Sequence, residues 1–194
     1  MPRPKQFDEQ DVLQKAVMLF WKQGYYHTSI QDLVNHLGIN RASLYGTFGG
    51  KKALFDRAFQ WYRTQQLVRL RAFLERQLNV RTGLRLLFQR IIEDDCADPD
   101  AQGCFMVNTT TELVPADVAV QDVLVTHRQS VQAIFATAIA RGIEQGNIAT
   151  DVQPTMIADL LYTLMTGLLV VGKTKADPSS LLATVDAVLS LLDS

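Results

Sequence analysis

The residues with the most evident chemistry lie in the stretch that begins at Thr28 and ends at Lys51, where polar and basic side chains accompany aromatic ones. Arg41 can form two parallel hydrogen bonds with guanine, worth about 1–3 kcal/mol of discrimination between bases. Residues of types that bond DNA phosphates are Thr28, Ser43, Tyr45 and Lys51. This combination predicts binding to double-stranded DNA.

A second candidate is the thiol of Cys104, which follows Gly103 and precedes Asn108 by four positions. We expect Cys104 at a helix N-terminus, where unpaired amides and the helix dipole stabilise a thiolate. Asp98 and Asp100 act in the opposite direction, and cysteine is among the residue types most often buried. A reactive thiol and a core cysteine are therefore both open interpretations.

Other chemistries have no pattern in this chain. Its three histidines and two cysteines lack metal-ligand spacing, and it carries no nucleotide-binding loop or triad-like set, so we expect no metal, no cofactor and no enzyme. The alternative from another class is a helical thiol-dependent enzyme or redox protein that uses Cys104. A third is an interaction module that keeps the fold without binding DNA.

Two short helices joined by a sharp turn must present the DNA-binding residues. Thr28 or Ser29 can cap the first helix, and Gly38 supplies the turn because it adopts positive φ at little cost. Asn40 caps the second helix, which runs to about Thr47. Such a pair is a helix-turn-helix, whose second helix enters the major groove.

The second of these helices has an inner and an outer side. Leu44 and Phe48 are expected to point into the core, whereas Tyr45 keeps a hydroxyl that a phosphate would satisfy. The outward candidates are Asn40, Arg41, Ala42, Ser43 and Gly46.

Charge is strongly segregated although the formal net charge is −1. Residues 1–57 hold eight Lys and Arg against five Asp and Glu, and residues 58–90 hold seven Arg against one Glu. Residues 91–194 hold four basic against fourteen acidic residues. One end of the molecule can therefore meet a polyanion, while we expect the arginines of the middle segment mostly on a solvated helix face.

Apolar residues recur at helical spacing along almost the whole chain, which predicts an all-α fold. The last two helices, from Pro154 and from Asp177-Pro178, carry more apolar surface than one buried side needs. We expect a dimer interface there, and a core helix rather than a membrane span at residues 156–171. The polar N-terminus and the few cysteines favour a reduced, cytoplasmic setting.

The run from Val12 to Phe55 resembles the N-terminal domain of the TetR family of transcriptional regulators. The matching positions are Ala16, Leu19, Phe20, Gly24 and Tyr25, the T-S-I-x-x-L segment from Thr28, L-G-I at 37–39, and Ser43, Leu44, Tyr45, Phe48 and Lys51. The resemblance implies a homodimeric repressor that reads a palindromic operator. It implies phosphate contacts by Tyr45 and Lys51, and a base contact in reach of Gln31.

The resemblance also implies a domain organisation. A helix-turn-helix domain is expected at 1–50, a long connecting helix at 51–77, and a helical effector-binding and dimerisation domain at 78–194. The last two helices would hold the partner subunit.

The segments GCFMVNTTTEL and VVGKTKADPSSL resemble a subgroup of that family that includes repressors of electrophile and hypochlorite defence genes. The resemblance implies that Cys104 is modified and that Lys173 is its partner, so that helices repack and operator affinity falls. The alternative is a reversible apolar ligand in a pocket between the central helices. The residues expected there are Phe88, Cys104, Asn108, Phe135, Tyr162 and Met165.

Overall fold

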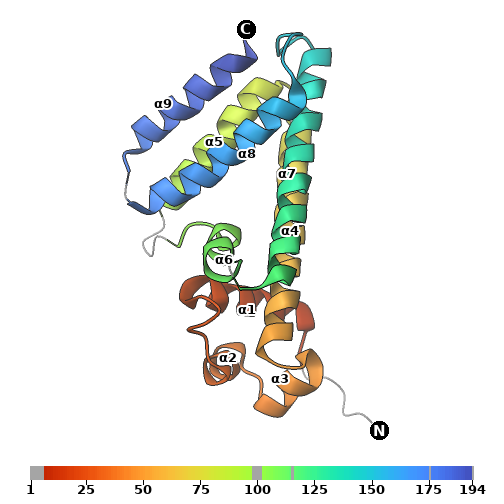
Figure 1. The fold of residues 1–194 in the computed structure, drawn as a ribbon, viewed down its shortest axis with the longest axis vertical. Helices are drawn as coiled ribbons and strands as arrows, with labels where there is room; N and C mark the ends of the chain where they lie inside the picture. Colours follow the sequence, from red (N-terminus) through yellow and green to blue (C-terminus); the bar gives the residue numbers. More distant parts are fainter. Residues whose placement is uncertain (1–6, 98–101, 115, 175, 194) are drawn as a thin grey trace. The chain divides into compact units, whose positions relative to one another are not determined.

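The protein is represented by a computed structural model, which describes residues 7–97, 102–114, 116–174 and 176–193. Within these ranges every regular element is a helix, which confirms the predicted all-α class (Figure 1). The chain forms two compact units, Met1–Gln66 and Leu67–Ser194, and the division falls inside the longest helix of the first half.

The first unit contains α1 (Glu9–Gln23), α2 (Ile30–Leu37), α3 (Arg41–Phe48) and the beginning of α4 (Lys51–Glu75). Its core is built around aromatic rings: Phe20 meets Phe55 edge-on with centroids 5.1 Å apart, and both side chains are almost fully buried. Leu33 of α2 and Leu44 of α3 are also fully buried, each 0% exposed. The short helices are therefore held by packing as well as by their ends.

The second unit contains the end of α4 and five further α-helices. They are α5 (Val80–Ala97), α6 (Phe105–Leu113), α7 (Val118–Glu144), α8 (Pro154–Val171) and α9 (Pro178–Leu189), with short 3-10 turns at Gly172–Thr174 and Ser190–Leu192. Predicted starts at Pro154 and after Asp177 are confirmed, since Asp177 accepts a hydrogen bond from the Ser180 amide. Helix α7 is capped by Asp117, whose side chain accepts a hydrogen bond from the Val120 amide.

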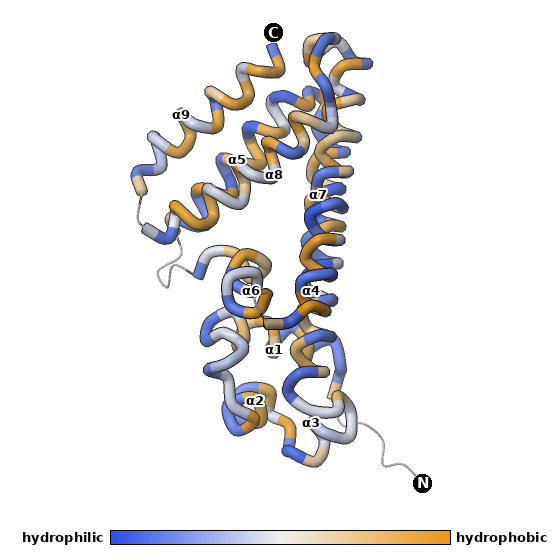
Figure 2. Tube along the Cα trace, viewed as in Figure 1, coloured by the Kyte–Doolittle hydropathy of each residue, from blue (hydrophilic) through white to orange (hydrophobic). Residues whose placement is uncertain are grey.

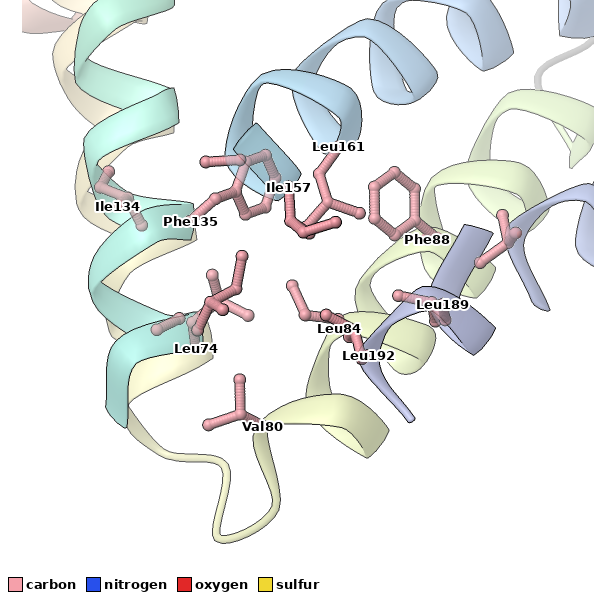
Figure 3. Close-up of a cluster of buried hydrophobic side chains, with 14 of the residues drawn as sticks. Leu74, Val80, Leu84, Phe88, Ile134, Phe135, Ile157, Leu161, Leu189 and Leu192 are labelled. Carbon is pink, nitrogen blue, oxygen red and sulfur yellow. The ribbon is translucent and has the colours of Figure 1, made fainter. Parts of the chain in front are cut away.

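The core of the second unit lies between α5, α7, α8 and α9 (Figure 3). Phe88 and Phe135 stack at its centre, with ring centroids 6.4 Å apart and planes inclined by 16°. Leu84, Leu161 and Leu189 surround the rings, and all three are at most 1% exposed. Both phenyl rings therefore fill the interior of the unit.

Two arginines of α5 bind acidic residues near the C-terminus. Arg81 donates two hydrogen bonds to Asp193, at 2.6 and 2.7 Å, and Arg85 donates two to Asp186, at 2.7 and 3.1 Å. The Arg85 guanidinium lowers the pKa of the Asp186 carboxyl through these hydrogen bonds. Both arginine side chains stay 35–36% exposed, so the two ion pairs lie on a solvated helix face, as expected for most of the arginine run.

Helix α8 and the turn that follows it are long and apolar enough to cross a membrane by length and composition alone (Figure 2). Its inward residues Ile157, Leu161 and Leu168 nevertheless belong to the core of the second unit. Only 28% of its most apolar window is buried inside the chain, and Met156 and Val170 are among the exposed residues. The helix thus has one packed face, and its uncovered residues combine the apolar Met156 and Val170 with Asp159, Thr163 and Gly167.

Candidate nucleic-acid interface and thiol site

The start of α2 is fixed by a reciprocal cap between Ser29 and Asp32. The Ser29 hydroxyl accepts a hydrogen bond from the Asp32 amide at 3.1 Å, and the Ser29 amide donates to the Asp32 carboxylate at 2.9 Å. Hydrogen bonds from the side chain and then the backbone of Ser29 lower the pKa of Asp32. Of the two predicted cap residues, Ser29 is therefore the cap.

Thr28 has a structural place instead. Its side chain is 0% exposed and its hydroxyl donates to the Gly24 carbonyl at 2.6 Å. A hydroxyl committed inside the unit is not presented to a phosphate. We therefore leave Thr28 out of the contact set proposed below.

The turn between α2 and α3 follows the predicted pattern. Gly38 ends α2 in the left-handed region, with φ 67°. Asn40 then caps α3, because its side-chain oxygen accepts a hydrogen bond from the Ser43 amide at 2.7 Å. These two residues set where α3 begins, and so which of its side chains face outward.

Helix α3 has the expected inner and outer sides. Leu44 is 0% exposed and Phe48 is 4% exposed, whereas Tyr45 is 46% exposed. The Arg41 guanidinium lies over the Tyr45 ring, 5.9 Å from its centroid. The exposed residues that share this side are Asn40, Arg41, Ala42, Tyr45 and Gly46.

The side chains around Tyr45 are also placed by the backbone that follows α3. Gly50 has φ 127°, and a Cβ there would lie 3.3 Å from a ring carbon of Tyr45, so the glycine leaves room for the ring. The Lys51 ammonium lies over the Tyr25 ring, 4.4 Å from the ring centroid. On α2, the Gln31 side chain donates a hydrogen bond to the Asn35 side chain at 2.9 Å and is exposed.

Arg57 of α4 holds the end of α3 and was not predicted to matter. Its guanidinium pairs with Glu9 at 2.6 Å, donates to the Thr47 carbonyl at 3.4 Å and lies 4.9 Å from the centroid of the Phe48 ring. No local sequence signal could have revealed this, because Glu9 and Arg57 are 48 positions apart.

The second candidate site surrounds the start of α6. Cys104 is the N-cap residue of α6, as predicted, and is half-buried. Lys173 donates a hydrogen bond to the side-chain oxygen of Asn108, whose amide nitrogen donates to the Gln102 carbonyl at 2.8 Å. Gly103 has φ 63°, and a Cβ there would lie 2.2 Å from a side-chain carbon of Lys173. The structure thus brings Lys173 across the residue that precedes Cys104.

The remaining predicted effector residues divide into two groups. Tyr162 belongs with the thiol: burial raises the pKa of its phenol, and the nearby Cys104 adds to that rise. Phe88 and Phe135 belong to the packed core, and Met165 is only partly buried against it. The acidic residues expected to oppose thiolate formation, Asp98 and Asp100, lie outside the described residues.

Comparison with known families gives one match for each part of the chain. Residues 12–58 match the model described as "Bacterial regulatory proteins, tetR family", and residues 66–188 match "Tetracyclin repressor-like, C-terminal domain". The HTH-type transcriptional regulator YezE of Bacillus subtilis is 32% identical over 195 residues, with 100% of both chains covered. The transcriptional repressor ComR of Escherichia coli is 28% identical, covering 97% of this chain and 90% of its own.

Solved structures agree with these matches. A cysteine mutant of the TetR-family regulator CifR, complexed with 26-base-pair operator DNA, is 31% identical with a TM-score of 0.83, and the match covers 97% of this chain and 98% of that one. The reduced form of E. coli NemR has a TM-score of 0.82 at 19% identity, with 91% and 93% covered, which shows the shared fold.

Proposed function

The chain belongs to the tetR family of bacterial regulatory proteins, and from this premise we propose that it is a homodimeric repressor. It binds a palindromic operator in the cytoplasm through α2 and α3, and an effector sensed in the second unit releases it. The matched families and relatives are regulators rather than enzymes, which sets aside the thiol-dependent enzyme.

The outer side of α3 carries the proposal. A capped short helix exposes Arg41 and Tyr45 together, and the relative solved on operator DNA covers nearly the whole chain. Arg41 is assigned to a guanine edge, whereas Tyr45 and Lys51 are assigned to phosphates. Further proposed contacts come from Gln31, Ser29, Asn40, Ala42 and Ser43.

DNA binding is tested by selecting duplexes from a random pool and measuring their affinity at several salt concentrations. We expect a two-fold symmetric site and a steep loss of affinity with salt. Lys51→Ala should weaken binding to all sequences and reduce the salt slope by about 1, whereas Arg41→Ala should relax specificity at one base pair. The control is Lys15→Ala, which removes an exposed lysine of α1 paired with Asp11. Failure to select any sequence would contradict the function.

The dimer is proposed to form through α8 and α9. Support comes from apolar side chains that the chain leaves exposed, including Met156 at 62%, Val170 at 48% and Leu191 at 46%. A second copy would cover the same face on both subunits, as a two-fold axis requires.

For the effector we propose chemical modification of the Cys104 thiol in preference to a reversible apolar ligand. The support is that Lys173, Asn108 and Tyr162 gather near a half-buried cysteine, while Phe88 and Phe135 pack against each other. The change needed is small, because a tenfold loss of operator affinity corresponds to about 1.4 kcal/mol.

The thiol is tested by measuring operator affinity before and after mild hypochlorite or N-ethylmaleimide. Treatment should release the wild-type protein and leave Cys104→Ser bound. The matched control is Cys96→Ser, which removes the exposed second cysteine and should respond as the wild type does. Equal release of wild type and Cys104→Ser would return Cys104 to a packing role and favour a reversible ligand.

A further inference from the structure

Gly46 is a glycine that the fold itself does not require. It lies in the interior of α3 and is exposed, and a Cβ built on it meets no heavy atom within 4 Å. The other described glycines of the first unit all have positive φ, whereas Gly46 does not. Neither backbone conformation nor packing inside the chain therefore explains its presence.

Glycine is unfavourable at such a position. It loses more conformational freedom than alanine when a helix forms, so an interior glycine weakens a helix as short as α3. Ala42 lies one turn earlier on the same side of the helix and is also exposed. Together Ala42 and Gly46 form a smooth strip beside the Arg41 and Tyr45 pair.

We propose that Gly46 marks the closest approach of α3 to the floor of the major groove, where the strip of Ala42 and Gly46 contacts the C5 methyl group of a thymine. This inference rests on the proposed function. The strip offers an apolar surface and no side-chain hydrogen-bonding group, and the thymine methyl is the apolar group of the major-groove edge. The absent Cβ leaves the space that this methyl occupies.

The strip and Arg41 are proposed to recognise different bases of the same half-site. Arg41 has donors for a guanine edge, and its guanidinium is kept beside the Tyr45 ring. The strip adds a test of shape, because any side chain at position 46 would collide with a methyl-bearing base held at that distance. Each half-site should therefore contain at least one thymine whose methyl group matters.

The experiment measures affinity for the duplex that the wild-type protein selects from a random pool, and for versions with each thymine of a half-site replaced by uracil. Gly46→Ala should weaken binding to the thymine duplex by about tenfold, and Gly46→Leu should weaken it further. One uracil position should weaken the wild type and restore much of the affinity of Gly46→Ala, because the new methyl takes the place of the one removed from the base.

Measurements of thermal stability and of binding to an unrelated duplex distinguish a lost thymine contact from a damaged fold. Alanine and leucine both favour helix over glycine, so both variants should melt about 2–4 °C higher than the wild type. Affinity for an unrelated duplex should not change, because phosphate contacts are untouched. The inference is overturned if Gly46→Leu binds the selected duplex as tightly as the wild type, or if no uracil position distinguishes Gly46→Ala from wild type. If the wild-type protein selects no duplex, the proposed DNA-binding function itself is contradicted.

Discussion

The two units expose different kinds of surface on helices of similar regularity. In the first unit, the outer side of α3 presents Arg41 and Tyr45 beside small side chains, above a core of aromatic rings. In the second unit, α8 presents Met156 and Val170, and the 3-10 turn after α9 presents Leu191, while the other sides of α8 and α9 fill the core. The first surface suits a polyanion, and the second suits an apolar partner.

The units also differ in how their key residues are positioned. The residues that start α2 and α3 are held by hydrogen bonds between positions three apart, from Ser29 to Asp32 and from Asn40 to Ser43. In the second unit, Lys173 is held by Asn108 across 65 positions, and Arg81 bonds Asp193 across 112. Local bonds make the first site a property of a short segment, whereas the second site exists only once its unit has folded.

The largest expected effect comes from emptying the core of the second unit. Phe135→Ala should lower the free energy of unfolding by about 3–5 kcal/mol, because the ring is 0% exposed and the cavity would not collapse fully. Both tryptophans, Trp21 and Trp61, lie in the first unit, so their fluorescence reports that unit while circular dichroism reports all helices. Denaturant unfolding followed by both signals should show the dichroism midpoint fall more than the fluorescence midpoint.

The matched control is Phe20→Ala in the core of the first unit, which should move the fluorescence midpoint more strongly. If both signals shift equally in both variants, the chain unfolds as one cooperative body. The contrast between two separately built units would then fail.

The next effect concerns the exposed face of α8. Val170→Glu should weaken the proposed dimer by at least about 100-fold, because each subunit would bury an unpaired charge in an apolar contact. Sedimentation across a range of protein concentrations measures this. Val118→Glu makes the same change on α7 at a residue that is 70% exposed, and should leave the dimer intact. Equal behaviour of the two variants would place the dimer contact elsewhere.

The sequence allowed the first unit to be predicted in some detail, because its signals are local. The caps at Ser29 and Asn40, the turn at Gly38 and the inward direction of Leu44 all follow from residue types at spacings of three or four. Thr28 was expected to contact a phosphate, whereas its side chain is buried and its hydroxyl donates to the Gly24 carbonyl four positions earlier.

The second unit could be predicted as a set of helices but not as a set of contacts. The helical period and Pro154 locate α8, yet nothing in the sequence pairs Arg85 with Asp186 from 101 positions away. The same holds for Arg57 and Glu9 in the first unit. Contacts of this kind depend on which helix faces which, and the periodicity of one helix does not carry that information.

The smallest expected effect is a loss of folding stability at acid pH, to which one carboxylate in each unit contributes. The pKa of Asp32 is lowered by hydrogen bonds from Ser29, and that of Asp186 is lowered by hydrogen bonds from Arg85. A carboxylate whose pKa is lower in the folded state stabilises the fold above its unfolded pKa of about 3.9. This contribution is lost as the pH falls through the folded-state pKa, so stability should decline below about pH 4.

Melting temperatures measured between about pH 6 and pH 3 test this through Ser29→Ala and Arg85→Ala. Each variant should melt below the wild type at pH 6, with about 1 kcal/mol lost for the missing cap of α2. The gap should narrow as the pH falls, because protonation removes the charge that Ser29 or Arg85 holds in the wild type. At pH 3, Ser29→Ala should still melt somewhat below the wild type, since the Asp32 amide still donates to Ser29 in the wild type. The difference in melting temperature between Arg85→Ala and the wild type should become smaller than that. Gaps that stay constant with pH would mean that neither carboxylate links folding to protonation.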